Sequence, residues 1–561
     1  QALAGGAFGA LLLAIGGNLY APAQLLRGGQ ATIAAFWWDK QIGIGWRASR
    51  IVCDGPRIAN DCRFPSSETI NEFPFFSFLL GDLHPHVMAL PIVIAALTLS
   101  LRWLIAPAGG ERRVELARAA ATGLVVGSLY TLNSWDYPTL LAATLAAVWL
   151  GNRAAPRRVV VNGVAIAAVS LIGWLPFWAR FAPPTGGHVI LPGWAHRVPL
   201  APLIARALGM HMGERTSLGE YLTIFGVPVA IGLTLLVVCL AQRRRVRGGF
   251  SLDLAWLAPA AAIAVLGIGL DAPVLVLAGW AALGGLHALS RAGRPSPFTV
   301  VTGLFTLGAA MSATVELFYI RDVFENRMNT LFKVYYQVWT LYMLAAAVAA
   351  ILLWRAIDRG AVVARVAYVV AGGAVVAAAL VYPLLASWQW TEHFTTWRGL
   401  DGIAYAAARY PDERAAIQFL RDRAALGDVL LEAAGCSYQP NGDLPFDRMS
   451  AYTGVPTVIG WGNHEAQWRA GEPDLLAGIA IRQADVARMY GQPDSPLIDD
   501  YAVTWLVVGR YERGDWQAIC PVAGPYPGID RPGFPGADWD LAFQRGDVAI
   551  YRRANASPAD G

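Results

Sequence analysis

Charged side chains are scarce in this chain of 561 residues. Asp, Glu, Lys and Arg make up 15% of the sequence, while 55% of the residues are hydrophobic. The mean hydropathy is positive, and the apolar residues gather in long Ala, Leu, Val and Gly runs rather than in alternating patterns. This shortage of charge excludes an ordinary soluble protein and is typical of a multi-pass α-helical membrane protein.

Several short motifs are also absent from the sequence. No RNA- or DNA-binding motif is present, and the net charge of +4 is explained by arginines in the loops of the membrane part, so nucleic acid is not expected as a partner. No Cys-x-x-Cys pair indicates a metal site. No glycine-rich phosphate loop opens a helix in the C-terminal part, which argues against nucleotide binding there.

Cysteine is rare, and its positions leave two alternatives open. Cys239 lies inside a predicted span, whereas Cys53, Cys62, Cys436 and Cys520 lie in predicted extracytoplasmic segments, where disulfides are permitted. The pairs Cys53–Cys62 and Cys436–Cys520 are compatible with the spacing. Free thiols are equally compatible with it.

What the sequence has in abundance is long apolar runs. Runs of about 18 or more apolar residues, long enough to cross a bilayer as a helix, cover 83–106, 222–241, 252–270, 297–318, 334–354 and 362–386. Shorter or interrupted runs cover 3–19, 115–131, 139–151, 158–178 and 272–289. Together these runs predict about eleven transmembrane helices.

The arginines predict the orientation, because short basic loops remain in the cytoplasm. The basic connections between the predicted spans contain Arg112, Arg113, Arg118, Arg153, Arg157, Arg158, Arg243, Arg244, Arg245, Arg247, Arg291, Arg294, Arg355 and Arg359. With about eleven spans these connections share one face. The opposite, extracytoplasmic face is then expected to carry the loops 21–81 and 179–220, the segments 133–138 and 321–333, and everything after about residue 387.

After Trp388 the apolar runs shorten and charged residues become more frequent. We therefore predict a transmembrane domain over 1–387 and a soluble extracytoplasmic α/β domain over 388–561. The expected helices of the second domain cover 411–425 and 473–490, and its expected strands cover 428–432, 501–509 and 547–552.

Two acids at the edge of an apolar run are candidate catalytic residues. Sugar transfer from a lipid phosphate needs a carboxylate to deprotonate the acceptor, and Glu72 or Asp82 could serve as this general base or organise a metal or phosphate. Asp82, however, follows Gly81 and precedes a helix with Pro85 near its first turn, as an ordinary N-cap does. Glu72 could equally be a solvated loop acid.

His84 and His86 complete the candidate catalytic set. Residues two apart point about 200° away from each other on a helix, so the two rings would ligate one metal only in an extended segment. Asp82 and His86, at i and i+4, can share a helix face. They could hold a divalent cation or form a structural hydrogen bond.

A second polar segment follows near residue 327. Arg327, Asn329 and Lys333 could bind a phosphate or pyrophosphate headgroup through charge-assisted hydrogen bonds. The alternative is that Asp322 and Glu325 simply pair with these side chains at the surface.

Aromatic and polar residues elsewhere extend the expected binding site. Asn133 and Asp136 could hold a sugar hydroxyl while neighbouring rings stack on the sugar, although interfacial anchoring explains the rings equally well. Tyr335 follows Lys333 closely and is added to the substrate-binding set.

A third cluster lies in the predicted soluble domain. Trp461, His464, Glu465 and Trp468 combine rings with ionisable groups in a way that suits carbohydrate contact. Packing of this domain onto the membrane part explains the cluster equally well.

Several of these segments together resemble a known family, the YYY membrane proteins of bacteria and archaea, a domain of unknown function also called Chlor_Arch_YYY. The resembling segments are Trp46–Arg50, Glu72–Phe78, Gly81–His86, Asn133–Thr139, Glu325–Asn329, Phe332–Trp339, Thr453–Trp461, His464–Glu465, Gln467–Arg469 and Val507–Arg513. The family is distantly similar to the GT-C glycosyltransferases, integral membrane enzymes that use polyprenyl-phosphate-linked sugars. The resemblance implies a plasma-membrane protein of a bacterium or archaeon.

One departure from the family concerns the N-terminal side. Family members also share a membrane portion with a Tyr-Tyr-Tyr stretch and an acidic first external loop, and neither is found in this chain. The chain begins at Gln1, without Met and without the basic region of a signal peptide, so we expect a fragment lacking the N-terminal part. The catalytic carboxylate of GT-C enzymes usually lies in the first external loop and could therefore lie outside this chain.

The leading prediction is a GT-C-like glycosyltransferase that takes a sugar from a polyprenyl-phosphate donor at the outer face of the membrane, with Mg²⁺ or Mn²⁺ as a cofactor it could use. One alternative is a transporter or flippase for a lipid-linked glycan. It would place charges in the middle of spans, whereas Asp271 and Glu316 lie near span ends. The other alternative is a non-catalytic assembly protein that binds a glycolipid or a partner through its C-terminal domain.

Overall fold

The computed structural model describes residues 2–34, 43–58, 61–62, 67–81, 83–106, 111–181, 201–247, 257–291, 293, 295–322, 324–357, 361–395, 397, 399–437, 444–469, 472–514 and 525–554. The chain divides into two units. Unit 1 comprises Gln1–Phe181 and Leu208–Thr396, and unit 2 comprises Ala182–Ala207 and Trp397–Gly561.

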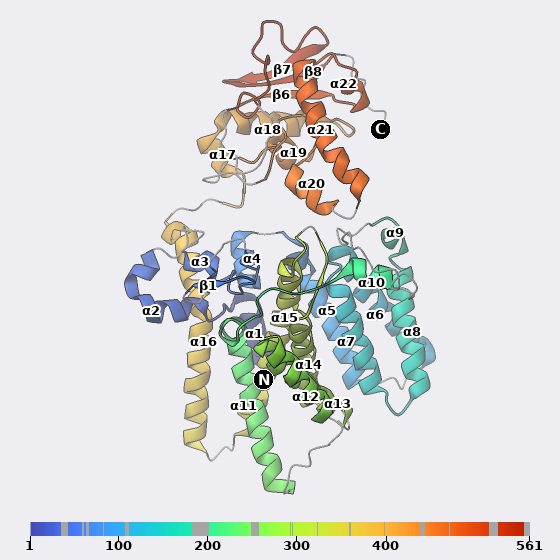
Figure 1. Cartoon of the computed structure of the whole chain (residues 1–561), viewed down its shortest axis with the longest axis vertical. Helices are drawn as coiled ribbons and strands as arrows, with labels where there is room; N and C mark the ends of the chain where they lie inside the picture. Colours follow the sequence, from blue (N-terminus) through green and yellow to red (C-terminus); the bar gives the residue numbers. More distant parts are fainter. Residues whose placement is uncertain are drawn as a thin grey trace. The chain divides into compact units, whose positions relative to one another are not determined.

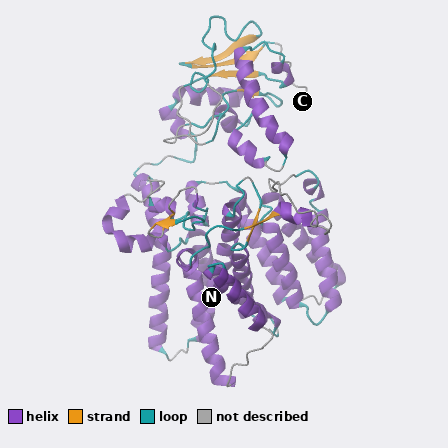
Figure 2. Ribbon diagram, viewed as in Figure 1, coloured by secondary structure: helices purple, strands orange, loops and turns teal. Residues whose placement is uncertain are grey.

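Unit 1 is almost entirely helical (Figures 1 and 2). Its helices are α1 (Ala2–Ala10), the π-helix η1 (Leu11–Ile15), α2 (Tyr20–Ala34), α3 (Ile44–Arg47), α4 (Pro74–Leu80), α5 (Pro85–Ile105), α6 (Arg112–Leu132), α7 (Asp136–Gly151), α8 (Pro156–Ile172), α9 (Leu175–Trp178), α11 (Leu218–Arg247), α12 (Leu257–Gly269), α13 (Pro273–Ser290), α14 (Pro297–Thr314), α15 (Met328–Ala356), α16 (Val362–Trp390) and the short 3₁₀-helix η5 (Glu392–Phe394). Many begin with proline, whose missing N–H and fixed φ suit the first turn of a helix.

Among the residues that the structure describes, six helices contain stretches that are long and apolar enough to cross a membrane: α5, α11, α13, α14, α15 and α16. A bent pair, Leu3–Ile15 with Tyr20–Gly28, makes a seventh if it is one span. Every predicted apolar run contains a helix. The count of about eleven spans is nevertheless not confirmed. Helices α7, α8 and α12 have 16, 17 and 13 residues, and α6 does not reach the same hydropathy.

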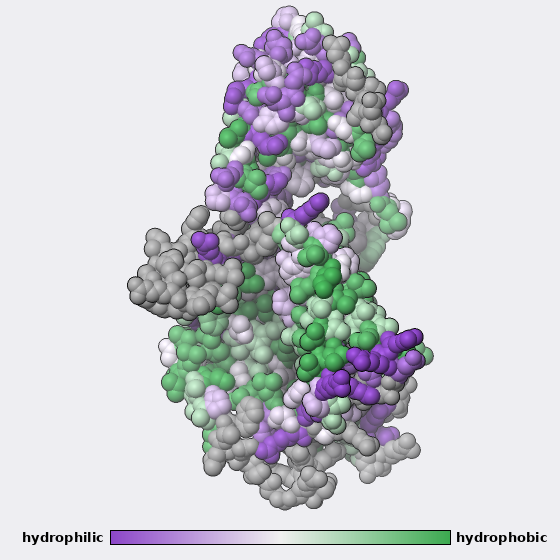
Figure 3. Space-filling view, turned by 90° about the vertical axis from the view of Figure 1, so that its right-hand side faces the viewer, coloured by the Kyte–Doolittle hydropathy of each residue, from purple (hydrophilic) through white to green (hydrophobic). Residues whose placement is uncertain are grey.

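Apolar side chains also cover much of the outside of unit 1. Figure 3 shows hydrophobic residues gathered over its helices. On α16 the exposed side chains include Val362, Val363, Val366, Val369 and Val370. An apolar outer surface of this extent is unusual for a soluble protein and fits a helical unit surrounded by lipid.

Helix α15 forms the centre of unit 1. Two thirds of its apolar window (67%) is buried inside the protein, and it packs against α1, α11 and α14. Tyr335, Trp339 and Tyr342 contribute its rings to a core shared with Tyr221 and Phe225 of α11. Helices α5, α6, α7 and α8 pack on one another as a second group (Figure 1).

Two small strand pairs accompany the helices. Strands β1 (Arg57–Ile58) and β2 (Asp61–Cys62) pair antiparallel, and so do β3 (Leu208–Met210) and β4 (Phe318–Ile320). A disulfide joins Cys53 to Cys62, which confirms the first predicted pair. Cys436 is also disulfide-bonded, and Cys520, its predicted partner, lies outside the described residues.

Unit 2 contains helices and a four-stranded sheet of order β5-β6-β8-β7. Strand β5 (Leu430–Leu431) runs parallel to β6 (Trp505–Val508), while β8 (Val548–Arg553) runs antiparallel to β6 and β7 (Trp539–Arg545). The helices are α10 (Ala201–Ala207), α17 (Ala404–Arg409), α18 (Pro411–Arg423), α19 (Arg448–Thr453), α20 (Gly462–Trp468), α21 (Pro473–Gly491) and α22 (Leu497–Asp500). Strand β6 is buried along its whole length, and α18 packs on the sheet.

Candidate functional site

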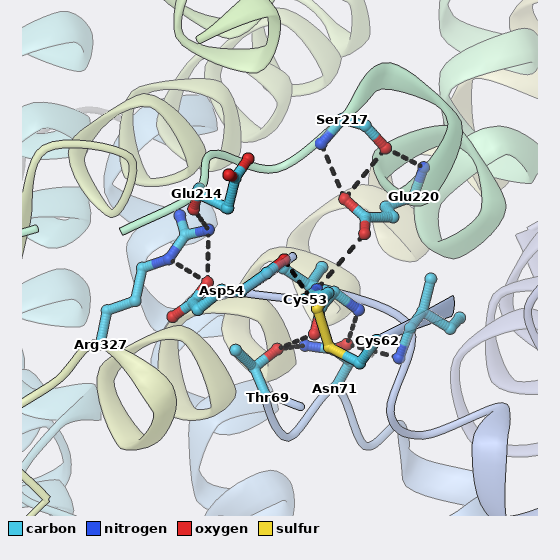
Figure 4. Close-up of a disulfide and its surroundings, with 12 residues drawn as sticks. Cys53, Asp54, Cys62, Thr69, Asn71, Glu214, Ser217, Glu220 and Arg327 are labelled. Atoms are coloured by element: carbon cyan, nitrogen blue, oxygen red, sulfur yellow. Dashed lines mark hydrogen bonds and ion pairs between the residues drawn. A yellow bond between two sulfur atoms is a disulfide. The ribbon is translucent and has the colours of Figure 1, made fainter. Parts of the chain in front are cut away.

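Arg327, a predicted phosphate ligand, lies fully buried between acids from distant parts of the chain (Figure 4). Its Nε donates to Asp54 Oδ1 at 2.9 Å and its Nη1 to Glu316 Oε1 at 2.9 Å and to the Val315 carbonyl. Its Nη2 donates to the Glu214 carbonyl and to Thr216 Oγ1, each at 3.2 Å. Every N–H of the guanidinium therefore already has an acceptor, and this arrangement leaves none for a phosphate.

The same interior contains further polar contacts around the disulfide. Cys53 N donates to Glu220 Oε1 at 3.3 Å, and the other oxygen of Glu220 accepts from Ser217 N and Oγ. Asn71 Oδ1 accepts from Val52 N at 2.7 Å. These bonds fix the segment that carries Asp54, so the ion pair with Arg327 forms between two rigid parts of unit 1.

Two other predicted site residues are also engaged by neighbours. Asn329 Nδ2 donates to Asp322 Oδ2 at 2.9 Å, so it pairs with Asp322 as the alternative expected, although Asp322 is buried rather than at the surface. Glu72 Oε1 accepts from both Nη atoms of Arg50 at 3.3 Å. Asp82 lies outside the described residues.

Lys333 and His86 form the centre of a polar cluster in unit 1. Lys333 Nζ lies 2.9 Å from His86 Nδ1, although 247 residues separate them. Both side chains are buried, with exposed fractions of 8% and 3%. The rings of Phe332 and Tyr336 flank His86, with centroid distances of 4.6 and 4.5 Å. Residues of α15 thus pack against the first turn of α5.

A third segment joins the cluster from the turn between α6 and α7. Asn133 Nδ2 donates to the buried Asp136 Oδ2 at 2.9 Å. Gln337 Nε2 donates to the Trp135 carbonyl at 3.0 Å. Three segments that the sequence analysis selected separately, at 84–86, 133–136 and 333–337, therefore converge.

The protonation pattern of the cluster follows from its donors and acceptors. A charged lysine has only donors, so Nδ1 of His86 accepts, and the neutral imidazole then has its proton on Nε2. His86 Nε2 has no hydrogen-bond partner among the described residues. The cluster thus combines an ammonium group with a buried N–H that lacks an acceptor. Both features suit an anionic oxygen.

His84 and Tyr335 lie differently from these residues. His84 is exposed, and its ring centroid is 5.5 Å from that of His86. Tyr335 packs against Phe225 and Tyr221. It follows Lys333 by two residues on α15, and residues at this spacing point in nearly opposite directions on a helix. His84 therefore adjoins the cluster of His86 and Lys333, while Tyr335 belongs to the core on the other side of α15.

Within the part of the chain that the structure describes, no group of three or more His, Cys, Asp or Glu side chains could hold a metal ion. The predicted divalent cation depends on Asp82, which falls outside that part.

In unit 2 the structure brings the predicted Trp461, His464 and Glu465 into one pocket. Its volume is about 300 Å³, and it is lined by Asp447, Ser450, Ala451, Gly454, Val455, Pro456, Thr457, Gly460, Trp461, His464, Glu465, Trp468 and Arg469. Trp461 Nε1 donates to the Phe446 carbonyl at 2.6 Å, and Glu465 forms an ion pair with Arg469.

Asp447 is the pocket residue that the sequence analysis missed. It is 2% exposed, and neither carboxylate oxygen has a hydrogen-bond partner among the described residues. Burial, together with the nearby Glu432, raises the pKa of Asp447 well above its ordinary value. An aspartate directly before a helix is normally an N-cap, but Asp447 makes no cap bond to α19. Its sequence position therefore gave no indication of an unpaired side chain.

The neighbouring Arg448, unlike Asp447, is hydrogen-bonded to buried side chains. Its guanidinium donates to Glu413 at 2.7 Å and to Glu512 at 3.0 Å, and all three side chains are buried. The two glutamates accept four hydrogen bonds from the guanidinium, and none of these bonds goes to Asp447.

Comparison with known proteins shows that the residues of the unit 1 cluster lie within a stretch that matches a protein-family model. Residues 1–342, more than half of the chain, match the model of a family described as uncharacterized membrane protein (DUF2298). The match is consistent with the resemblance to YYY membrane proteins and carries no link to the GT-C enzymes. It includes His86, Asp136 and Lys333 but not the pocket of unit 2. No curated protein matches the chain.

Proposed function

Since the chain belongs to a family of uncharacterized membrane proteins (DUF2298), we propose its function from its own residues: an integral membrane glycosyltransferase that takes a sugar from a polyprenyl-phosphate donor. The transfer occurs at the outer face of the membrane, in the plasma membrane of a bacterium or archaeon.

The convergence of His86, Lys333 and Asp136 supports this proposal. When the acceptor oxygen bonds to the sugar C1, the bond from C1 to the phosphate oxygen breaks, and negative charge develops on the leaving polyprenyl phosphate. The Lys333 ammonium and the Nε2–H of His86 are donors suited to that charge. Both are largely shielded from water, which strengthens the interaction.

The acceptor must lose its proton to a carboxylate. Asp82, four residues before His86 in the sequence, is our choice for this base. Glu72 is ion-paired with Arg50 and is assigned a positioning role instead. Arg327 and Asn329 are left out of the phosphate site because their donors are already used within unit 1.

The positions of the charged residues along their helices favour an enzyme over a flippase. Lys333 is the sixth residue of α15, and Asp136 is the first residue of α7. Charges near helix ends suit a site at the membrane surface, where a lipid phosphate lies, whereas a glycan path across the membrane requires polar groups at mid-depth.

The test uses the full-length protein in proteoliposomes with a panel of polyprenyl-phosphate sugars and added Mg²⁺ or Mn²⁺. We expect consumption of one donor, about 10²–10³-fold slower in Lys333→Met because one charge-stabilising donor is lost, and abolished in Asp82→Asn. Arg321→Met is the matched control, since it removes a cation that is paired on the surface with Glu325.

If no donor is consumed although thermal unfolding shows that the protein is folded, the proposed transferase activity is refuted. Movement of a fluorescent lipid-linked glycan between leaflets in the same vesicles would then identify a flippase. Full activity in both Lys333→Met and Asp82→Asn would place the reaction elsewhere in the chain.

A further inference from the structure

The pocket of unit 2 contains a carboxylate that folding has left without a partner. Asp447 is almost completely buried, and both of its oxygens lack a hydrogen bond among the described residues. Burying such a group costs free energy, and buried polar groups in native proteins are nearly always paired. Since Asp447 lines the pocket, a ligand in the pocket could supply the missing hydrogen bonds.

The walls of this pocket include two tryptophan rings. The indole of Trp461 is held in place by its hydrogen bond to the Phe446 carbonyl. Trp468, at the end of α20, is 53% exposed. Exposed aromatic side chains beside a polar group offer an apolar face to a ligand that also forms hydrogen bonds.

The remaining polar groups narrow the class of ligand. Arg469 offers donors, Glu465 offers acceptors, and the two form an ion pair beside His464 on the same wall. The carboxylate of Glu465 disfavours an anionic ligand such as a phosphate, and Arg469 disfavours a cationic one. A neutral molecule with many hydroxyls both donates and accepts, so it satisfies this combination.

We propose that this pocket binds a sugar residue, with one face of the ring against Trp468 and with hydroxyl groups hydrogen-bonded to Asp447. The volume of about 300 Å³ is at the lower end of the range for ligand pockets and suits one or two sugar rings. The pocket belongs to unit 2 and the cluster of His86 and Lys333 to unit 1, and sugar binding in the pocket does not depend on glycosyl transfer by unit 1.

The experiment measures saturation-transfer NMR of the full chain in detergent. The probes are the methyl glycosides of glucose, mannose, galactose and N-acetylglucosamine, with tetramethylammonium as a cationic probe. We expect transfer to at least one glycoside. Its affinity should fall about tenfold or more in Trp468→Ala, which removes the ring, and in Asp447→Leu, which removes both hydrogen-bonding oxygens.

Trp397→Ala is the matched control. Trp397 belongs to the same unit, is 86% exposed and lies outside the pocket, so its loss should leave binding unchanged. Trp468→Ala removes a half-exposed side chain, so unfolding should not obscure the result.

Three outcomes would overturn the proposal. One is the absence of transfer to every glycoside at millimolar concentration. Another is binding that is equally strong in the parent, Trp468→Ala and Asp447→Leu. The third is transfer to tetramethylammonium alone, which would make the pocket a cation site.

Discussion

Buried ionisable side chains of two kinds occur in this protein. Arg327 and Arg448 are surrounded by acids that use all or most of their donors, and such residues hold segments together. Asp447 and the Nε2 of His86 are buried without partners, which makes them a cost to folding. The second kind indicates a site, because a ligand can supply what the protein does not.

The loss of Arg327 should be strongly destabilising. Arg327→Met leaves Glu316, which is 0% exposed, and Asp54 without their cation, so we expect a loss of about 3–5 kcal/mol. Thermal unfolding in detergent measures it. Arg321→Met, which breaks a more exposed ion pair with Glu325, should cost less than about 1 kcal/mol. Equal losses in the two variants would contradict the proposed role of Arg327.

Asp447→Asn should have the opposite effect and stabilise the protein. Its raised pKa means that folded Asp447 keeps a proton that the unfolded chain releases above about 3.8. The folded state then binds more protons, so its stability falls as the pH rises. The variant should gain about 1–3 kcal/mol at neutral pH.

The comparison of unfolding midpoints at pH 5 and pH 7.5 tests this linkage. The advantage of Asp447→Asn over the parent should be larger at pH 7.5, because Asn does not titrate. An advantage of the same size at both pH values, or a loss of stability, would show that Asp447 is ionised or paired.

At the scale of elements, α6 and α8 approach each other closely through glycine. A Cβ on Gly123 would lie 2.7 Å from the Ile166 carbonyl oxygen, and one on Gly127 would lie 2.4 Å from the Ser170 carbonyl oxygen. Since both obstacles are backbone atoms, a side chain there must push the helices apart. Small residues spaced four apart allow this kind of close packing between membrane helices.

Gly127→Ala should therefore destabilise unit 1 by about 1–3 kcal/mol. The matched control is Gly163→Ala on α8, where a Cβ would meet only a side-chain carbon of Leu145 at 3.5 Å. That is an ordinary contact, and alanine favours helix, so this variant should be neutral or slightly stabilising. Thermal unfolding of both variants under one condition decides the matter.

The sequence predicted some of these features and not others, for a physical reason. Helix positions, the membrane-protein class and the Cys53–Cys62 bond depend on residues near one another in the chain. The partners of Arg327 could not be predicted, because Asp54 is 273 residues away. Asp447 was missed because its burial depends on how strands and helices of unit 2 assemble, while its local context resembles a normal helix cap.

For the whole molecule, the side of the membrane on which each loop lies depends on whether the shorter helices cross the membrane. Helix α7 has 16 residues and is about 24 Å long, less than the roughly 30 Å of a bilayer core. If it crosses, the 133–136 turn before it and the loop after it lie on opposite faces. The arginines near residue 157 predict that the later loop is cytoplasmic.

Cysteine labelling tests that path. Ser134→Cys and Ala154→Cys, each in a Cys239→Ser background, flank α7. We expect an impermeant maleimide to label Ser134→Cys in intact cells and Ala154→Cys only after lysis. Labelling of both in intact cells would mean that α7 does not cross, and the predicted orientation of every later segment would have to be reversed.

The segment around residue 53 makes a disulfide and an ion pair, and the two can form at different times during synthesis. Cys53 and Cys62 are 9 residues apart, so they can join once this short stretch has been synthesised. Asp54 must wait for Arg327, which a ribosome reaches on the order of tens of seconds later. Until then the nascent chain carries acids without their cation. Premature termination before Arg327 therefore leaves a product in which the disulfide can form while Asp54 and Glu316 lack their cation.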